Sequence, residues 1–195
     1  MAFPDNALSS APQVSGFAGS RALATTKTVD YEDGGIGIQD TSKGLLYQRW
    51  RARLIDGHTV LLDAPNVPAF ALYEGAGITE ISFSFDSNMR PVLAFVQAGA
   101  AKLRWFDSVV GEQVITEIGA GALTPRVSLD DKRIVGSDGY QISDVILGYV
   151  RDGSLYYRQQ RDRFTVERLL ATGITKGLIK IGFSRGLRLQ FMLEI

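Results

Sequence analysis

Apolar and polar side chains alternate with a period of two along much of the chain, a pattern that predicts β-strands with two different faces. The clearest case is the segment from residue 45 to residue 54, where apolar side chains alternate with arginine. One face carries Leu46, Gln48, Trp50, Ala52 and Leu54, and the other carries Tyr47, Arg49, Arg51 and Arg53. Asp56-Gly57 then predicts a tight hairpin turn, with residues 58–62 returning as the partner strand.

Short runs rich in β-branched and aromatic residues follow, separated by turns that contain Gly, Asn or Asp about every ten residues. These runs cover residues 78–85, 92–97, 102–106, 113–118, 144–150, 155–161, 165–170, 178–183 and 187–193. Residues 158–170 have some helical character, but their aromatic and β-branched members favour strands. The pattern therefore predicts an all-β protein built from antiparallel sheets.

A weak internal repeat suggests how these strands are grouped. Residues 93–96, a Gly-containing turn and residues 103–106 correspond to residues 147–150, the Asp152-Gly153 turn and residues 155–158. A Ser-x-Asp strand end precedes each hairpin, at 84–86 and at 128–130. The period of roughly 45 to 55 residues is the size of a propeller blade. We therefore predict two blade-like units, about 78–118 and 124–170, and a C-terminal hairpin, in a partial propeller or sandwich-like stack whose open edges need neighbours.

The first 42 residues have a different composition from the rest. They are rich in Ala, Ser, Gly, Thr and Asp, and their apolar residues are scattered. Such a segment cannot bury enough apolar surface to form its own core. We therefore predict an extended N-terminal arm over residues 1–42 and a β domain over residues 43–195.

The charge balance and the residue types exclude several function classes. Lys plus Arg and Asp plus Glu both number 21, so no overall field attracts a nucleic acid, and we expect no nucleic-acid partner. The chain contains no Cys, which rules out disulfides and thiolate metal sites. No apolar run approaches the roughly 18 to 20 residues of a membrane span, and the N-terminus shows no leader, so we expect synthesis in a cytoplasm without membrane insertion.

Few residues indicate catalysis. His58 is the only histidine and lies in a predicted turn, which disfavours a triad or a multi-histidine metal site. Carboxylates that could act in pairs as in a glycosidase, or bind calcium, are Asp86, Asp130, Asp131, Asp138, Asp144 and Asp162. Asp86, Asp138 and Asp144 stand beside Gly or Ser at strand ends, where Asp caps the local backbone. We therefore predict no catalytic residue, no metal site and no cofactor.

Arginine and aromatic residues are interleaved most densely over residues 156–168. Such a cluster can stack on single-stranded nucleic acid, but nearby acidic residues offset its charge. Arginine and aromatic side chains are also enriched at the anchor points of protein interfaces. The predicted interface residues are Trp50, Arg51, Arg53, Tyr157, Arg158, Arg161 and Arg163.

Residues 144–153, 155–164 and 187–191 resemble segments of virion proteins of tailed bacteriophages, and residues 84–106 are similar in style. The resemblance, which covers about residues 78–195, implies a non-catalytic structural subunit of the distal tail, baseplate or tail tip. It implies several copies that bind one another and other virion tail proteins, after synthesis in the host cytoplasm.

Three alternatives remain open at this point. The first is a module that recognises a host-surface receptor or glycan through exposed Trp50, Trp105 or Tyr157. The second is a head-to-tail connector subunit, which needs the same physical features as a tail subunit. The third is a glycan-cleaving enzyme that uses a pair of aspartates.

Overall fold

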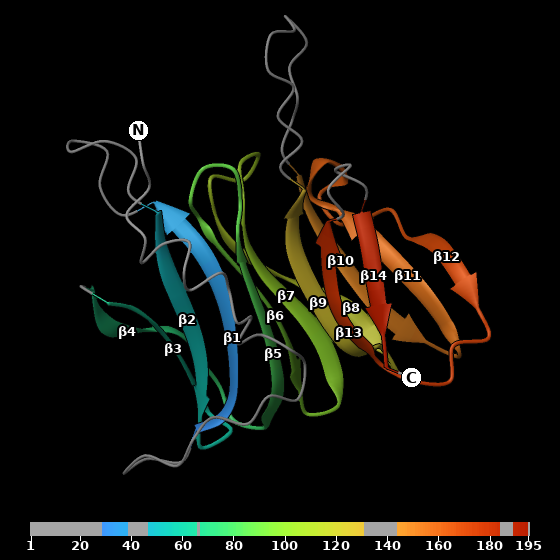
Figure 1. Ribbon diagram of the computed structural model, residues 1–195, viewed down its shortest axis with the longest axis horizontal. Coiled ribbons are helices and arrows are strands. Elements are labelled where there is room, and N and C mark those ends of the chain that lie inside the picture. Colours follow the sequence, from blue (N-terminus) through green and yellow to red (C-terminus); the bar gives the residue numbers. More distant parts are fainter. Residues whose placement is uncertain (1–28, 39–46, 66, 131–143, 184–188, 195) are drawn as a thin grey trace, which may run out of the picture.

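The structure of the protein, a computed structural model, describes residues 29–38, 47–65, 67–130, 144–183 and 189–194 (Figure 1). Apart from turns and one short 3₁₀ segment, these residues form β-strands, and the strands pair in an antiparallel manner. The prediction of an all-β fold with antiparallel sheets is therefore confirmed.

The described strands form four sheets in chain order. The first contains β1 (Val29–Ile38), β2 (Tyr47–Ile55), β3 (Thr59–Ala64) and β4 (Val67–Glu74). The second contains β5 (Ile78–Phe85), β6 (Pro91–Gln97), β7 (Ala100–Asp107) and β8 (Glu112–Ala120). The third contains β9 (Leu123–Asp130), β10 (Asp144–Arg151), β11 (Ser154–Gln159) and β12 (Arg168–Thr172), with the 3₁₀ segment η1 (Gln160–Asp162) after β11. The fourth contains β13 (Leu178–Phe183) and β14 (Leu189–Leu193).

The sheets stand face to face, and their first strands lie beside one another (Figure 1). Strand β5 packs against β1 on one side and against β9 on the other, and β9 in turn contacts β13. Within each sheet the chain then runs outward from strand to neighbouring strand, so β4, β8 and β12 end the three larger sheets. The result is a stack of antiparallel sheets with sandwich-like packing between them.

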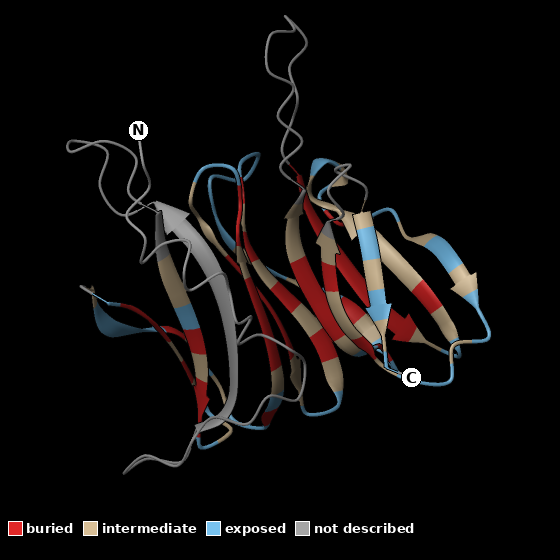
Figure 2. Ribbon diagram, in the orientation of Figure 1, coloured by how far each residue is buried: buried red, intermediate tan, exposed pale blue. Residues whose placement is uncertain are grey.

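Apolar side chains form three core clusters between the four sheets. Figure 2 shows the buried residues concentrated on the inner strands of the stack. The inner strands β6 and β10 of the second and third sheets are buried on both faces. On β6, Leu93 and Phe95 face the first sheet, and Val92 and Ala94 face the third. Burial on both faces explains why β6 and β10 are continuous apolar runs, whereas the outer strands are more polar.

The internal repeat has a direct structural counterpart. The hairpins β6–β7 and β10–β11 are the second and third strands of their sheets, and the two Ser-x-Asp motifs end the first strands, β5 and β9. The sequence predicts two such units, but the structure has a further four-stranded sheet, β1 to β4.

The predicted arm over residues 1–42 is wrong for Val29–Ile38. These residues form β1, which pairs with β2 along its whole length. Pairing with β2 and packing on β5 supply the contacts that the composition of this segment cannot provide alone. Residues 1–28 and 39–42 lie outside the described part of the chain.

Other strand boundaries also differ from prediction. The sequence pattern missed β4, which contains Pro68 and is mostly exposed, and β9, which contains Pro125. The run predicted over residues 155–161 ends at Gln159, and the run predicted from residue 165 begins at Arg168. Between them the backbone turns through η1 and through left-handed conformations at Arg163 (φ 53°) and Phe164 (φ 56°).

Candidate functional site

The turn between β11 and β12 carries two of the predicted interface residues, Arg161 and Arg163. The carboxylate of Asp144, which is buried at the start of β10, anchors this turn. Its Oδ1 accepts a hydrogen bond from the backbone N–H of Arg161 at 2.9 Å, and its Oδ2 accepts one from Arg161 Nε at 2.6 Å. The strand cannot continue past this point because Asp144 captures the N–H of Arg161.

The same turn fastens the third sheet to the second. Arg163 Nε and Nη2 donate to Oδ2 of buried Asp107 at 3.0 and 2.5 Å. The ring of Phe164 is fully buried and meets Trp105 edge to face, with 5.0 Å between centroids. Arg161 and Arg163 therefore bind within the chain, although about half of each side chain stays exposed (50% and 49%).

Arg158 belongs to a polar cluster at the same contact between the sheets. Its Nε donates to the hydroxyl of Tyr149 at 3.0 Å, and its Nη2 donates to the carbonyl of Ile118 on β8 at 3.1 Å. Glu167 receives a hydrogen bond from Tyr149 and ion pairs from Arg151 at 2.5 Å and Arg158 at 3.1 Å. The cluster links β8, β10, β11 and the start of β12.

This cluster shifts the pKa values of its members. Burial raises the pKa of Tyr149 well above its ordinary value, and its hydrogen bond to Glu167 raises it further. Burial also acts to raise the pKa of Glu167, but hydrogen bonds from Tyr149, Arg151 and Arg158 outweigh it, so the net pKa is lowered. The arrangement therefore keeps Glu167 charged and Tyr149 protonated, which suits a fixed structural contact.

The remaining predicted interface residues also have partners in the chain. Arg51 Nε donates to Asp63 at 3.0 Å, and Arg53 binds the same carboxylate. Trp50 is half-buried and meets Phe85 edge to face at 5.5 Å.

Tyr157 is also half-buried. Its ring lies 6.3 Å from that of Phe191, and the guanidinium of Arg168 lies 5.7 Å from its centroid. The structure thus places the predicted residues in two groups: Trp50, Arg51 and Arg53 on the first sheet, and Tyr157, Arg158, Arg161 and Arg163 on the third.

The exposed aromatic platform expected for a glycan-recognition module is wrong at Trp105. Only 3% of this residue is exposed, and its Nε1 donates to Thr116 at 2.9 Å. The sequence could not show this, because the ring is covered by Phe164, which lies far along the chain.

The candidate carboxylates whose side chains the structure describes are Asp86, Asp144 and Asp162, and all three make structural contacts. Asp86 Oδ1 accepts the N–H groups of Asn88 at 2.8 Å and Arg90 at 2.9 Å, which confirms its predicted role in a turn. Asp144 is held by Arg161. Oδ2 of Asp162 forms an ion pair with Arg168 Nη2 at 2.6 Å, in a geometry that does not meet the angles of a hydrogen bond. The side chain of Asp130 and all of Asp131 and Asp138 lie outside the described residues.

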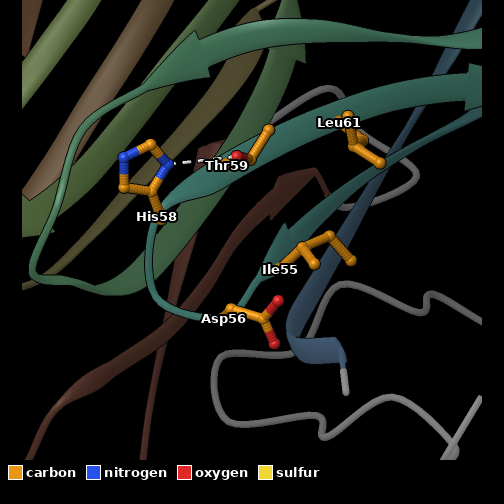
Figure 3. A pocket seen from close by; sticks show the side chains of 5 residues that line it. All are labelled: Ile55, Asp56, His58, Thr59 and Leu61. Atoms are coloured by element: carbon orange, nitrogen blue, oxygen red, sulfur yellow. Dashed lines mark hydrogen bonds between the residues drawn. The ribbon is translucent and has the colours of Figure 1, made fainter. Parts of the chain in front are cut away.

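His58 lies in the predicted hairpin turn and is exposed, as expected. It lines a pocket of about 350 Å³ together with Ile55, Asp56, Thr59 and Leu61 (Figure 3). The imidazole Nδ1 lies 3.2 Å from Thr59 Oγ1, and the Asp56 carboxylate points away from the ring. No pair of groups for acid and base catalysis converges there among the residues that Figure 3 draws.

The described residues contain no metal-ligand cluster and no membrane-spanning helix. Within them, no three His, Asp or Glu side chains gather closely enough to hold a metal ion. No helix in this part of the chain is long and apolar enough to cross a membrane.

Open sheet edges are expected from the sequence, but the sequence pattern does not single out the apolar side chains that are exposed on the outer strands. Strands β4, β8, β12 and β14 each pair on one side only among the described strands. Large apolar side chains are exposed on all four: Phe70, Ile115, Leu169, Leu170 and Met192. The adjacent leucines of β12 were a usable signal, because two consecutive exposed apolar residues place one on each face of the strand.

Comparison with protein-family models, with curated proteins and with solved structures gave no significant match.

Proposed function

We propose that the chain is a structural subunit of a bacteriophage tail, in the distal tail, baseplate or tail tip. In this role, copies of the chain and other tail proteins bind to its outer strands. No catalytic step and no cofactor belong to the proposal.

One observation carries the proposal most strongly: the outer strands combine unpaired edges with exposed apolar side chains. Leu169 is 57% exposed and Leu170 is 44% exposed, so β12 presents apolar surface on both faces. An exposed strand edge offers free N–H and C=O groups that another chain can pair with. Such edges suit a protein that works in contact with neighbours.

The polar residues support a structural role in a second way. The arginines and buried carboxylates described above hold turns and join neighbouring sheets. A rigid subunit with fixed contacts between its sheets transmits load between neighbours without a moving part. About half of each of the Arg51, Arg161 and Arg163 side chains is exposed, and the proposal keeps these residues as interface contacts.

The test is to look for the protein in assembled particles. Tailed particles from a lysate that produces this chain are purified on a density gradient, and their proteins are quantified by mass spectrometry. A gold-labelled Fab fragment raised against the purified chain then locates it by electron microscopy. We expect several copies per particle and label at one position on the tail.

A Fab fragment against an unrelated host protein serves as the control for labelling. Denaturing immunoblots of the same particles detect the chain even where neighbours hide its surface. The proposal fails if the chain stays in the unassembled fraction and is missing from purified particles by both methods.

A further inference from the structure

The fourth sheet differs from the other three because it has two described strands, β13 and β14, instead of four. Strand β14 pairs with β13 on one side, and no described strand pairs with its other edge. Leu189, Phe191 and Leu193 pack into the core against the third sheet, while Gln190 and Met192 are exposed. The strand is thus held on one face by the core, and its other edge is unpaired among the described residues.

The edge of β14 carries neither charge nor proline, two of the features that usually protect an outer strand, although the strand is five residues long and its pairing with β13 includes a register shift. Natural edges carry charges, proline or irregular pairing, which prevent addition of a further strand. Strand β4 contains Pro68 and Glu74, β8 contains Glu112 and Glu117, and β12 begins with Arg168. Strand β14 reads Leu-Gln-Phe-Met-Leu and has no charge and no proline.

We infer that β14 pairs with β14 of a second copy of this chain, antiparallel across a two-fold axis. This pairing creates one continuous sheet in the order β13, β14, β14 of the partner and β13 of the partner. The shared sheet has four strands, like each of the other three.

A two-fold axis at Phe191 pairs all five residues of the strand. Leu189 then lies opposite Leu193 of the partner subunit, and Gln190 lies opposite Met192 of the partner subunit. No like charges meet in this register, because the strand is uncharged. Directly opposed residues in such a pair have Cβ atoms about 4.5–5.5 Å apart. Like charges introduced at opposed positions therefore repel each other.

The size of the contact sets the strength of the association. Five paired residues bury less than the roughly 1,200–2,000 Å² of a standard stable interface. We therefore expect a weak, reversible dimer in isolation, in the micromolar range or above for its Kd. In an assembled particle, further contacts would add to it. The inference thus deepens the proposed assembly function and rests on it for its biological role.

The experiment uses charge pairs on the full chain. The double variant Gln190→Glu with Met192→Glu puts two glutamate pairs opposite each other across the axis. A second double variant, Gln190→Lys with Met192→Lys, does the same with lysine. Each variant alone should weaken dimerisation about tenfold or more, and an equal mixture of the two should restore it as a heterodimer.

A matched control lies on β8, where Gln113 and Ile115 have the same spacing and similar exposure. Gln113→Glu with Ile115→Glu introduces the same charge on a different outer strand and should leave the dimer unchanged. Light scattering over roughly a hundredfold concentration range around the micromolar values expected for a weak contact gives the mass of each sample. Circular dichroism shows that each variant is folded.

The outcomes are distinct. Weakening by both β14 variants, rescue by mixing and an unaffected β8 variant support the β14 pairing. A wild-type chain that stays monomeric throughout overturns it, as does association that is equally strong in all variants or that mixing fails to restore. These results leave the proposed tail function standing if the chain is still found in purified particles, so the two failures can be told apart.

Discussion

At the scale of single residues, Gly148 shows how closely the fourth sheet lies on the third. A Cβ atom at this position on β10 would lie 2.9 Å from Leu178 Cδ2, 2.9 Å from Phe191 Cε1 and 3.0 Å from Ile181 Cδ1. Leu178 and Ile181 are buried, so these side chains cannot all move away together. Any larger residue here would therefore force side chains of β13 and β14 to shift.

We predict that Gly148→Ala lowers the free energy of unfolding by about 1–3 kcal/mol, because the added methyl group overpacks this layer. Urea denaturation measures the change. Gly182→Ala on β13 is the matched control, since nothing lies within 4 Å of a Cβ atom there. Equal effects of the two substitutions would show that the close packing at Gly148 has no energetic consequence.

The lowered pKa of Glu167 leads to a second prediction at the residue scale, which concerns the pH dependence of stability. Its pKa in the folded chain is lowered from an ordinary value of 4.5, chiefly by hydrogen bonds that outweigh burial. A carboxyl group with a lowered folded pKa contributes stability above the unfolded pKa and loses it as pH falls through the folded pKa. The free energy of unfolding should therefore fall as pH drops below about 4.5.

Substitution of Glu167 by Gln removes this titration, so the variant should be less stable than wild type at neutral pH and should converge with it in acid. Thermal unfolding at a series of pH values gives both curves. Curves that stay parallel through the acid range would mean that Glu167 does not contribute in this way.

At the scale of elements, buried Arg126 joins the first strands of three sheets. From β9, its Nε donates to the carbonyl of Ile179 on β13 at 2.9 Å, and its Nη2 forms an ion pair with Glu80 on β5. A third bond runs from Nη1 to the carbonyl of Pro125 at 2.7 Å. The strands β5, β9 and β13 pack beside one another without backbone pairing, and the guanidinium links them through its own hydrogen bonds.

We predict that Arg126→Met destabilises the fold by about 3 kcal/mol, since it leaves Glu80 and a carbonyl without their partner. The double variant Arg126→Met with Glu80→Met removes both charges and should recover part of that loss. Chemical denaturation of wild type, both single variants and the double variant completes the cycle. A double variant no more stable than Arg126→Met alone would argue against an unpaired Glu80 as the cause.

The strands that can be predicted from sequence are those whose local composition reflects their burial. Strands β5, β6 and β10 are apolar because the sheets bury them, and each was recognised from local composition. Strand β1 was missed because its polar and glycine-rich sequence is ordered by pairing with β2. Strand β4 was missed because it is exposed and lacks alternation.

The density of arginines near aromatic side chains predicts a subunit interface but says nothing of partners within the chain. The structure gives these arginines such partners. The partner of Arg163 is Asp107, which lies 56 positions away on another sheet. Sequence spacing carries no information about such a pair, because the stacking of sheets creates it.

At the scale of the whole molecule, both end faces of the stack carry charged side chains. The outer face of the first sheet carries Arg51, Arg53 and Asp63. On the fourth sheet, Lys180 lies opposite exposed Met192, on the face away from the core. Both faces therefore present positive side chains, and stacking one copy on another face to face would bury them at a cost. Assembly through strand edges avoids this cost.

The most direct measurement of the central claim is hydrogen–deuterium exchange of the chain, free in solution and within purified tailed particles. An unpaired strand edge exchanges its amide protons quickly, and pairing with a neighbour slows that exchange. The account predicts slower exchange in the particle for one or more of β4, β8, β12 and β14, with β6 and β10 protected in both states. Outer strands that exchange equally fast in both states, or particles that contain none of the chain, would contradict it.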